Sequence, residues 1–422
     1  MQLRRARAEP APCATLCGME LVVEQKHFGP RSFFAALVAV NICVILAVDM
    51  YAPALPGIQR EFGVTEAYLN LTMFAFFLFS AVGVLCAGPA SDQMGRKPVM
   101  LAGMGVFAAG SFACAAASGV EALAAARSVQ AVGYGIVITV ESAMLKDSYA
   151  GLDLKTVMTV LQSLIIVGPA IAPFLGTFIL AVAGWREIFV LLAELGAASF
   201  LVVCAMRETS AGSARLRAAD GAAQDGFAGA MRAMGRGMAE LVRDRRFVAL
   251  ALYMGVAGVP YFAFIAVVSY VILDFFAASY MTYNLVYAAI SLVSVAAPFV
   301  YAALSRRVAS GKILAGAVAF VLASGAALCA FGAAGPWALL LAFVPYALAE
   351  GVVRPLAFVE LLDQPPHRVG AASSAANLSY TVITSVATVL ATLPWPTFIT
   401  GLWALTLATG VTMALLLFVR YR

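Results

Sequence analysis

The chain has 422 residues, of which 63% are hydrophobic and only 12% are charged, with a formal net charge of +5. Soluble domains contain roughly 25% charged residues, so the composition excludes an ordinary soluble protein and indicates an integral membrane protein. The histidines, His27 and His367, lie outside the apolar runs, and no P-loop, GxSxG or HExxH motif is present. Common enzyme and ATPase signatures are therefore missing, and we expect no enzyme activity, no cofactor and no metal.

Apolar runs of about 20 residues recur along the chain, and each can cross a hydrocarbon core roughly 30 Å thick as a helix. Lipid permits helices or a closed barrel, and long uninterrupted apolar runs favour helices over alternating strands. We therefore predict an all-α membrane protein with twelve transmembrane helices. The predicted spans are 33–54, 68–88, 99–118, 122–144, 157–182, 187–206, 247–272, 281–304, 313–334, 337–361, 370–393 and 396–419.

The basic residues set the predicted topology. With the N-terminus inside, every Lys and Arg except Arg60, Arg127, Arg186 and Arg354 falls in a cytoplasmic segment. Cytoplasmic loops carry an excess of Lys and Arg, so we expect a multi-pass protein of the cell inner membrane with both termini in the cytoplasm. The net positive charge is then explained by topology and does not indicate a nucleic-acid partner.

The stretch GPASDQMGRKPV, residues 88–99, lies between the second and third predicted spans. Asp92 can pair with Arg96 and accept hydrogen bonds from a helix N-terminus. The stretch resembles the G-x3-D-R-x-G-R-R loop of the major facilitator superfamily, although Gln93 stands where a basic residue is usual. The resemblance implies a gating loop in which Asp92 acts as a conformational latch. The matching residues are Gly88, Asp92, Gly95, Arg96 and Lys97.

Spans one and four carry opposite charges, Asp49 and Arg127, both in the outer third of the membrane under this topology. Arg127, Gln130 and Gly133 match the superfamily's R-x-x-Q-x-x-G pattern, and the resemblance makes the two spans neighbours. An unpaired charge at mid-membrane costs roughly 2.5 kcal/mol or more, so we expect Asp49 and Arg127 to meet. Only Asp49 can readily lose its proton, which makes it the expected proton carrier; the alternative is a permanent structural ion pair.

Glu141 lies on the same predicted face of span four as Arg127, Gln130 and Tyr134. It stands about 21 Å further inward than Arg127 by helix rise, near the inner mouth. We expect a second protonation site or a cation attractor; the alternative is an interfacial carboxylate that pairs with Lys146 or water.

The fifth span contains GPAIAPFLG, which resembles the Gly-Pro signature of antiporters in the superfamily. Prolines remove backbone donors and bend a helix, whereas glycines permit close helix packing. The final glycine pair of the signature is reduced here to Gly176–Thr177. The residues of this antiporter-like motif are Gly168, Pro169, Pro173 and Gly176.

The longest polar stretch divides the spans into six and six, as expected for two bundles related by a parallel pseudo-twofold axis. The end of this stretch, FAGAMRAMGRGMAELVRD, is expected to form a helix that tethers the halves or lies on the lipid surface. The predicted parts are a cytoplasmic segment 1–32, a six-helix bundle 33–206, a linker 207–246, a six-helix bundle 247–419 and a cytoplasmic tail 420–422.

Span ten holds Tyr346, Glu350 and Arg354 at four-residue steps, which predicts an intrahelical pair between Glu350 and Arg354. This pair either stabilises a helix beside a watery cavity or forms a polar clamp in which Arg354 binds an anionic or zwitterionic group. An apolar cavity with aromatic and acidic residues suits lipophilic or cationic compounds. The predicted cavity residues are Tyr51, Gln130, Tyr134, Phe262, Tyr346, Glu350 and Arg354.

The stretches DMYAPALP, GWREIF and VGAASS resemble the drug:proton antiporter branch, which includes bicyclomycin and chloramphenicol exporters. This resemblance covers essentially all spans and implies the major facilitator fold, a monomer in the lipid bilayer, a small-molecule substrate and protons as partners. We expect proton-coupled efflux of small lipophilic or cationic drugs by alternating access. The alternative is a proton-coupled symporter or exporter of a sugar, organic acid or amino acid. A non-transporting sensor would have no need for charges inside its spans.

Overall fold

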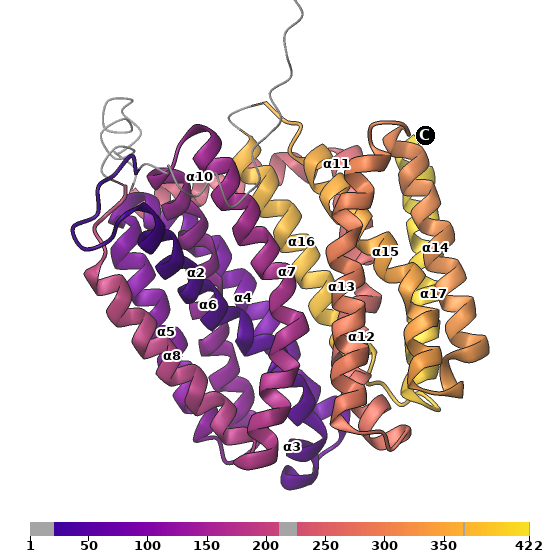
Figure 1. Cartoon of the computed structure of the whole chain (residues 1–422). Helices are drawn as coiled ribbons and strands as arrows, with labels where there is room; N and C mark the ends of the chain where they lie inside the picture. Colours follow the sequence, from indigo (N-terminus) through magenta and orange to yellow (C-terminus); the bar gives the residue numbers. More distant parts are fainter. Residues whose placement is uncertain (1–20, 211–225, 366–367, 422) are drawn as a thin grey trace, which may run out of the picture.

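A computed structural model describes residues 21–210, 226–365 and 368–421 (Figure 1). Within these ranges every regular element is helical. The first group of helices is α2 (Pro30–Asp49), η2 (Ala52–Ala54), α3 (Leu55–Phe62), α4 (Glu66–Met94), α5 (Arg96–Ala115), α6 (Val120–Ser148), α7 (Gly151–Val182) and α8 (Trp185–Ala205).

A helix in the predicted linker, α10 (Gly226–Leu241), separates this N-terminal group from the C-terminal group. The linker helix expected from the sequence is therefore present, and residues 211–225 of the linker lie outside the described residues. The C-terminal group is α11 (Arg245–Ala257), α12 (Val259–Ser269), η4 (Tyr270–Phe275), α13 (Tyr280–Leu304), α14 (Ser310–Phe331), η5 (Gly332–Ala334), α15 (Pro336–Leu361), α16 (Val369–Leu390) and α17 (Phe398–Tyr421).

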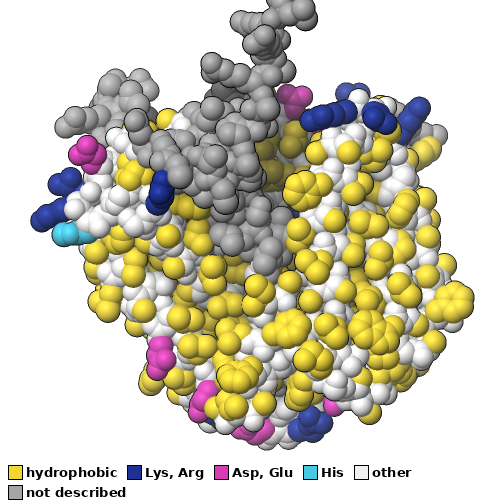
Figure 2. Space-filling view, viewed as in Figure 1, with side chains coloured by type: hydrophobic (Ala, Val, Ile, Leu, Met, Phe, Trp, Pro, Cys, Tyr) yellow, Lys and Arg dark blue, Asp and Glu magenta, His cyan; other side chains and the backbone are white. Residues whose placement is uncertain are grey.

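Ten helical segments among the described residues are long and apolar enough to cross a membrane. The two remaining predicted spans, 157–182 and 370–393, coincide with α7 and α16, which have 32 and 22 residues. Figure 2 shows flanks covered by hydrophobic side chains, with most charged side chains of that view near the two ends. An all-helical membrane protein is thus established, and the count of twelve spans stays a prediction.

The N-terminal and C-terminal groups lie side by side, with α4 packed against α16 and α7 against α13 (Figure 1). Described hydrogen bonds between the groups lie at the end opposite the termini. There Arg60 pairs with Asp274 at 3.3 Å, and Asn284 at the start of α13 donates to Thr177 near the end of α7 at 2.8 Å. At the end that carries the termini, α10 packs on both α4 and α16. The groups are therefore joined directly at one end and through α10 at the other.

The seventh predicted span consists of two α-helices rather than one, because the helix is interrupted at Gly258 between α11 and α12. Pro260 has no N–H to continue the helical hydrogen bonds. The hydroxyl of Tyr346 on α15 spans the break, since it accepts from the Tyr261 N–H at 3.0 Å and donates to the Ala257 carbonyl at 2.7 Å. A side chain of another helix thus satisfies the backbone groups that the break exposes.

The Gly-Pro motif lies inside α7, which continues as a helix through Pro169 and Pro173. Its glycines face α2 closely. A Cβ on Gly168 would lie 2.9 Å from Cγ2 of Ile45. The motif therefore lets α7 pack tightly against the helix that carries Asp49.

We expect Gly176→Ala to destabilise the protein, because its Cβ would lie 2.5 Å from the backbone oxygen of Met50. Overpacking of this kind costs typically about 1–3 kcal/mol. Thermal unfolding in detergent measures the loss as a lower midpoint. The matched control is Gly316→Ala, which meets nothing within 4 Å and should be neutral or slightly stabilising by helix propensity. Equal midpoints for the two variants would contradict close α2–α7 packing.

Candidate functional site

Asp49 is the last residue of α2, where the prolines of the following DMYAPALP stretch end the helix. The side chain is buried, with 4% of its surface exposed. Its Oδ1 accepts a hydrogen bond from the hydroxyl of Tyr287 on α13 at 2.5 Å. Because α2 and α13 belong to different groups, this bond joins the N-terminal and C-terminal helices through a buried carboxylate.

Arg127 on α6 is enclosed within the N-terminal group, with 1% of its surface exposed. Its Nη1 donates to the Ala47 carbonyl at 3.0 Å and to Oε1 of Gln130 at 2.8 Å. The guanidinium also lies over the rings of Phe76 and Tyr51, 4.1 and 4.7 Å from their centroids. Carbonyl, amide and π faces therefore stabilise this buried cation.

The predicted ion pair between Asp49 and Arg127 is wrong for this conformation. No such pair lies among the ion pairs of the described ranges. Arg127 is satisfied within its own group, and Asp49 receives its hydrogen bond from Tyr287 instead. The role of Asp49 in proton coupling stays a prediction.

Three residues predicted to line the cavity are buried elsewhere. Tyr51, Gln130 and Tyr346 each have no exposed surface. The hydroxyl of Tyr51 forms a hydrogen bond with Thr72, and the side-chain amide of Gln130 donates a hydrogen bond to Ser111. The hydroxyl of Tyr346 forms a hydrogen bond with the backbone at the interruption between α11 and α12. These residues support the helices around the cavity in this conformation and do not line it.

Glu141 on α6 is buried completely, in contact with α2. Its Oε2 accepts from Nδ2 of Asn41, whereas its Oε1 has no hydrogen-bond partner among the described residues. The alternative interpretation, an interfacial carboxylate beside Lys146, is wrong because Lys146 is exposed and Glu141 is not. A second protonation site here stays a prediction.

Partly exposed aromatic residues from both groups of helices interact with Asp49 and Arg354. Tyr134 on α6 and Tyr261 on α12 each interact electrostatically with both Asp49 and Arg354. Both tyrosines are part-buried, as is the neighbouring Phe262. This places the predicted cavity residues Tyr134, Phe262 and Arg354 in one region, with contributions from both groups.

The predicted pair of Glu350 and Arg354 interacts electrostatically but makes no direct contact, since the described ion pairs do not include it. Both residues contact Tyr380 on α16 instead. The hydroxyl of Tyr380 donates to Oε1 of Glu350 at 3.2 Å, and the Arg354 guanidinium lies 4.6 Å from the Tyr380 ring centroid. The aromatic side chain of a neighbouring helix has displaced the expected contact within α15.

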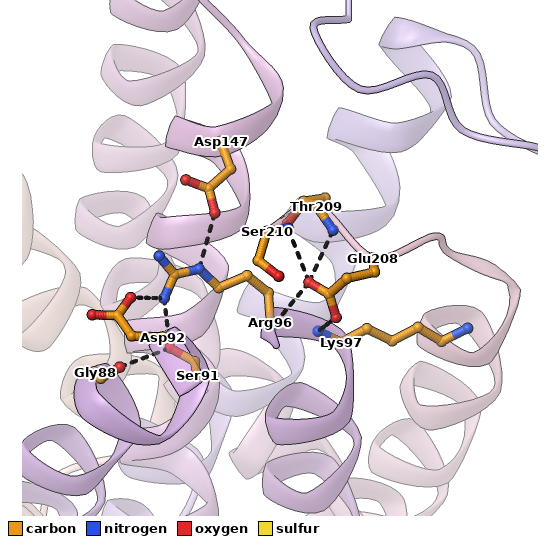
Figure 3. A network of polar contacts seen from close by, with 9 residues as sticks. All are labelled: Gly88, Ser91, Asp92, Arg96, Lys97, Asp147, Glu208, Thr209 and Ser210. Carbon is orange, nitrogen blue, oxygen red and sulfur yellow. Dashed lines mark hydrogen bonds and ion pairs between the residues drawn. The ribbon is translucent and has the colours of Figure 1, made fainter. Parts of the chain in front are cut away.

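The predicted gating loop is shorter than its sequence suggests, because Gly88 lies inside α4 and only Gly95 separates α4 from α5. Gly95 has φ +97°, a conformation that favours glycine, and a Cβ there would lie 2.6 Å from Oε2 of Glu208. Figure 3 shows the carboxylate of Glu208 beside the start of α5. The turn therefore requires glycine for its backbone conformation and for close approach by an acid.

The predicted contact between Asp92 and Arg96 is confirmed at 2.6 Å. Arg96 also pairs through Nε with Asp147 at the end of α6 at 2.9 Å, and its Nη1 donates to Ser91 at 2.7 Å (Figure 3). Sequence reasoning missed Asp147, although an acid at the end of the fourth span, level with this loop, was the available signal. One arginine thus links α4, α5 and α6.

The carboxylate of Glu208 caps the N-terminus of α5, a role that the sequence predicted for Asp92. It accepts from the backbone N–H groups of Arg96 at 2.8 Å and Lys97 at 3.0 Å. Burial raises the pKa of Glu208, but hydrogen bonds from Ser210 and from these two N–H groups lower it below the ordinary value. An acid just after the sixth span, in a basic segment, was the missed sequence signal.

Glu208→Gln should lower the thermal midpoint at neutral pH, because the ionised carboxylate binds the N–H groups of α5 more strongly than an amide does. The folded pKa lies below the ordinary 4.5, so this stability is fully present above 4.5 and is lost as pH falls through the folded value. The difference between wild type and variant should stay constant from about pH 8 to about pH 6 and shrink below about pH 4.5.

The matched control for this titration is Glu187→Gln, because Glu187 is an exposed acid on α8. It should give the wild-type midpoint throughout. If the difference in thermal midpoint between wild type and Glu208→Gln grew on acidification, this would contradict stabilisation by the ionised carboxylate.

Among the described residues, no group of three or more His, Cys, Asp or Glu side chains could hold a metal ion. The site instead offers a buried carboxylate joined across the two groups, aromatic faces and one exposed guanidinium. This chemistry suits reversible binding of a proton and of a small organic molecule.

Comparisons with known proteins agree with this architecture. The family model described as Major Facilitator Superfamily matches residues 37–388. The chain is 25% identical over 334 residues to the "Uncharacterized MFS-type transporter YdgK" of Bacillus subtilis (strain 168), covering 78% of this chain and 80% of that protein. It is 32% identical over 175 residues to a "Chloramphenicol resistance protein" of Pseudomonas aeruginosa, covering 40% of this chain and only 42% of that relative.

Among solved structures, a bacterial homologue of the human lysosomal transporter Spinster, in an inward-facing and occupied conformation, gives a TM-score of 0.70. The match covers 93% of this chain and 96% of that chain at 14% identity. At this identity the likeness concerns the fold alone.

Proposed function

This chain belongs to the Major Facilitator Superfamily, and on that premise we propose that it is a proton-coupled antiporter that exports small lipophilic or cationic compounds. The proposal includes two six-helix bundles, joined by the linker 207–246, in the cell inner membrane with both termini cytoplasmic. Similarity to a chloramphenicol resistance protein of Pseudomonas aeruginosa and to the multidrug transporter MdfA of Yersinia pestis bv. Antiqua (strain Angola) supports export of drugs.

The observation that carries the proposal is the hydrogen bond from Tyr287 to Asp49, because it crosses between the two groups. A ligand shifts a conformational equilibrium only through its different affinity for the two states. A proton or a substrate cation on Asp49 competes with Tyr287 for the carboxylate. Binding of the proton or the cation therefore weakens a hydrogen bond that stabilises the present arrangement of the two groups.

The proposed cycle follows from this competition. In the present conformation the groups are joined at the end opposite the termini, which the topology makes the outer end. Ionised Asp49 holds Tyr287 and keeps the empty carrier in this state. Substrate entering from the cytoplasm displaces the contact, the carrier opens outward, and a proton on Asp49 then replaces the substrate and allows the return. The alternation requires a single carboxylate that serves both ligands in turn.

The network around Arg96 supports a rigid-body movement of the N-terminal group. Arg96 connects α4, α5 and α6, while Glu208 fastens the segment after α8 to the start of α5. We propose that Asp92 serves as a latch within this unit. Because the network restrains the helix ends together, movement at Asp49 is transmitted to the interface with the C-terminal group.

Asp49→Asn should abolish the uncoupler-sensitive part of drug efflux, because an amide cannot carry the proton. Cells that express wild type or variant are loaded with chloramphenicol or a lipophilic cation dye, and accumulation is measured with and without the uncoupler. We expect at least a tenfold loss, since general acid–base groups typically contribute about 10²-fold or more. Asp363→Asn, at an exposed acid after α15, is the matched control for charge removal.

Membrane levels of both variants are measured in the same cells. Full uncoupler-sensitive efflux by Asp49→Asn would make Asp49 structural. Accumulation driven by wild type would indicate a symporter of a nutrient, and no effect of wild type on any compound would indicate a sensor.

Tyr287→Phe should let protons leak without substrate, because the empty carrier loses the bond that holds ionised Asp49 in this state. A hydrogen bond to a charged group contributes about 1.5–3 kcal/mol, which predicts a leak about tenfold or more above wild type. Proteoliposomes with an imposed pH gradient and an internal pH dye measure it. Tyr283→Phe is the matched control, since this hydroxyl on the same helix has no hydrogen-bond partner among the described residues. Equal leaks would refute the coupling role of Tyr287.

A further inference from the structure

We infer that the exported compounds carry an acidic group that binds the guanidinium of Arg354, in addition to an aromatic body. The inference rests on the proposed function and deepens it by naming a substrate class. With the cation site proposed at Asp49, the preferred substrates are aromatic zwitterions rather than simple lipophilic cations.

Arg354 has no direct ion-pair partner, although it interacts electrostatically with Glu350. No salt bridge or hydrogen bond to its side chain occurs among the described residues, and its contact is the ring face of Tyr380. Arginine stays protonated in proteins, so the charge cannot be removed by deprotonation. An uncompensated charge within a span costs roughly 2.5 kcal/mol or more, and Glu350 compensates Arg354 without a direct contact. Because that contact is not made, water or an anionic ligand solvates the donors of the guanidinium.

The acid nearest to Arg354 along α15 interacts with it electrostatically but makes its hydrogen bond with Tyr380. Glu350, one helical turn earlier on α15, has 8% of its surface exposed and accepts from the hydroxyl of Tyr380 at 3.2 Å. The donors of the guanidinium thus remain available to a ligand.

Arg354 interacts with side chains of both groups of helices. Its side chain is exposed, although it interacts electrostatically with Tyr134 of the opposite group and with Tyr261 of α12. An exposed side chain that interacts with residues of both groups lies where the groups meet and is accessible to solvent. Asp49 interacts with the same two tyrosines, so an anion site and a cation site flank one aromatic region.

The walls beside Arg354 suit a flat ring system. Phe262 lies edge-on to Phe77 of the opposite group at 4.7 Å and to Tyr380 at 6.1 Å between ring centroids. Rings in this arrangement present faces and edges that pack against an aromatic ligand. The planar guanidinium binds a carboxylate through two parallel hydrogen bonds, which fixes the orientation of such a ligand.

A matched pair of probes tests the inference: the zwitterionic fluoroquinolone ciprofloxacin and its carboxamide, which differ only in the acid. Export of each is measured in cells that express wild type, Arg354→Gln or Arg306→Gln, with ethidium as a cation that has no acid. Arg306 is an exposed arginine after α13 and controls for loss of a positive charge. We expect wild type to prefer the acid, and Arg354→Gln to lower the ratio of acid export to amide export at least tenfold.

Binding of ciprofloxacin to purified protein, followed by the anisotropy of its own fluorescence, gives a second readout that does not depend on proton coupling. Affinity should fall at least tenfold in Arg354→Gln and stay at the wild-type value in Arg306→Gln. An equal loss of acid and amide export would show that Arg354 is structural and would overturn the inference.

Two further outcomes separate this inference from the proposed function. If wild type exports ethidium in a manner that depends on Asp49 but does not prefer ciprofloxacin to its carboxamide, the inference alone is overturned. If wild type exports none of the probes, both the inference and the proposed function are overturned.

Discussion

The hydrogen bond between Tyr287 and Asp49 places a buried carboxylate at the interface of the two helix groups. A carboxylate buried without a donor is strongly unfavourable, so the position of α13 and the ionisation of Asp49 are linked. Whatever binds the carboxylate changes the stability of the whole interface. Under the proposed function, charge and conformation are connected at this contact, as coupled transport requires.

This connection requires that each group move as a unit, and the N-terminal group is built accordingly. Arg96 and Glu208 join the helix ends near the terminal side, while the cage around Arg127 holds α2 and α6 together in the interior. Close glycine contacts fasten α7 to α2. A perturbation at Asp49 is therefore not absorbed locally and reaches the interface.

Arg127, which is buried, and Arg354, which is exposed, illustrate opposite solutions to one electrostatic problem. Arg127 is surrounded by carbonyl, amide and aromatic groups of its own helices and is buried, so a ligand does not reach it in this conformation. Arg354 rests on Tyr380 and otherwise faces solvent. The difference lies in their neighbours and not in the residue type, and under the proposed function it makes Arg354 the one that selects substrate.

Membrane insertion, the positions of the helical spans and the contact between Asp92 and Arg96 follow from the sequence alone, because hydropathy, helical period and close spacing are local properties. The donor to Asp49, by contrast, lies 238 residues away, and the acid that caps α5 lies 112 residues from Arg96. Opposite charges at equal depth predicted a partner for Arg127, but nearer carbonyl and aromatic groups took that place. Which groups surround a buried charge depends on how the helices meet, and only the tertiary structure decides that.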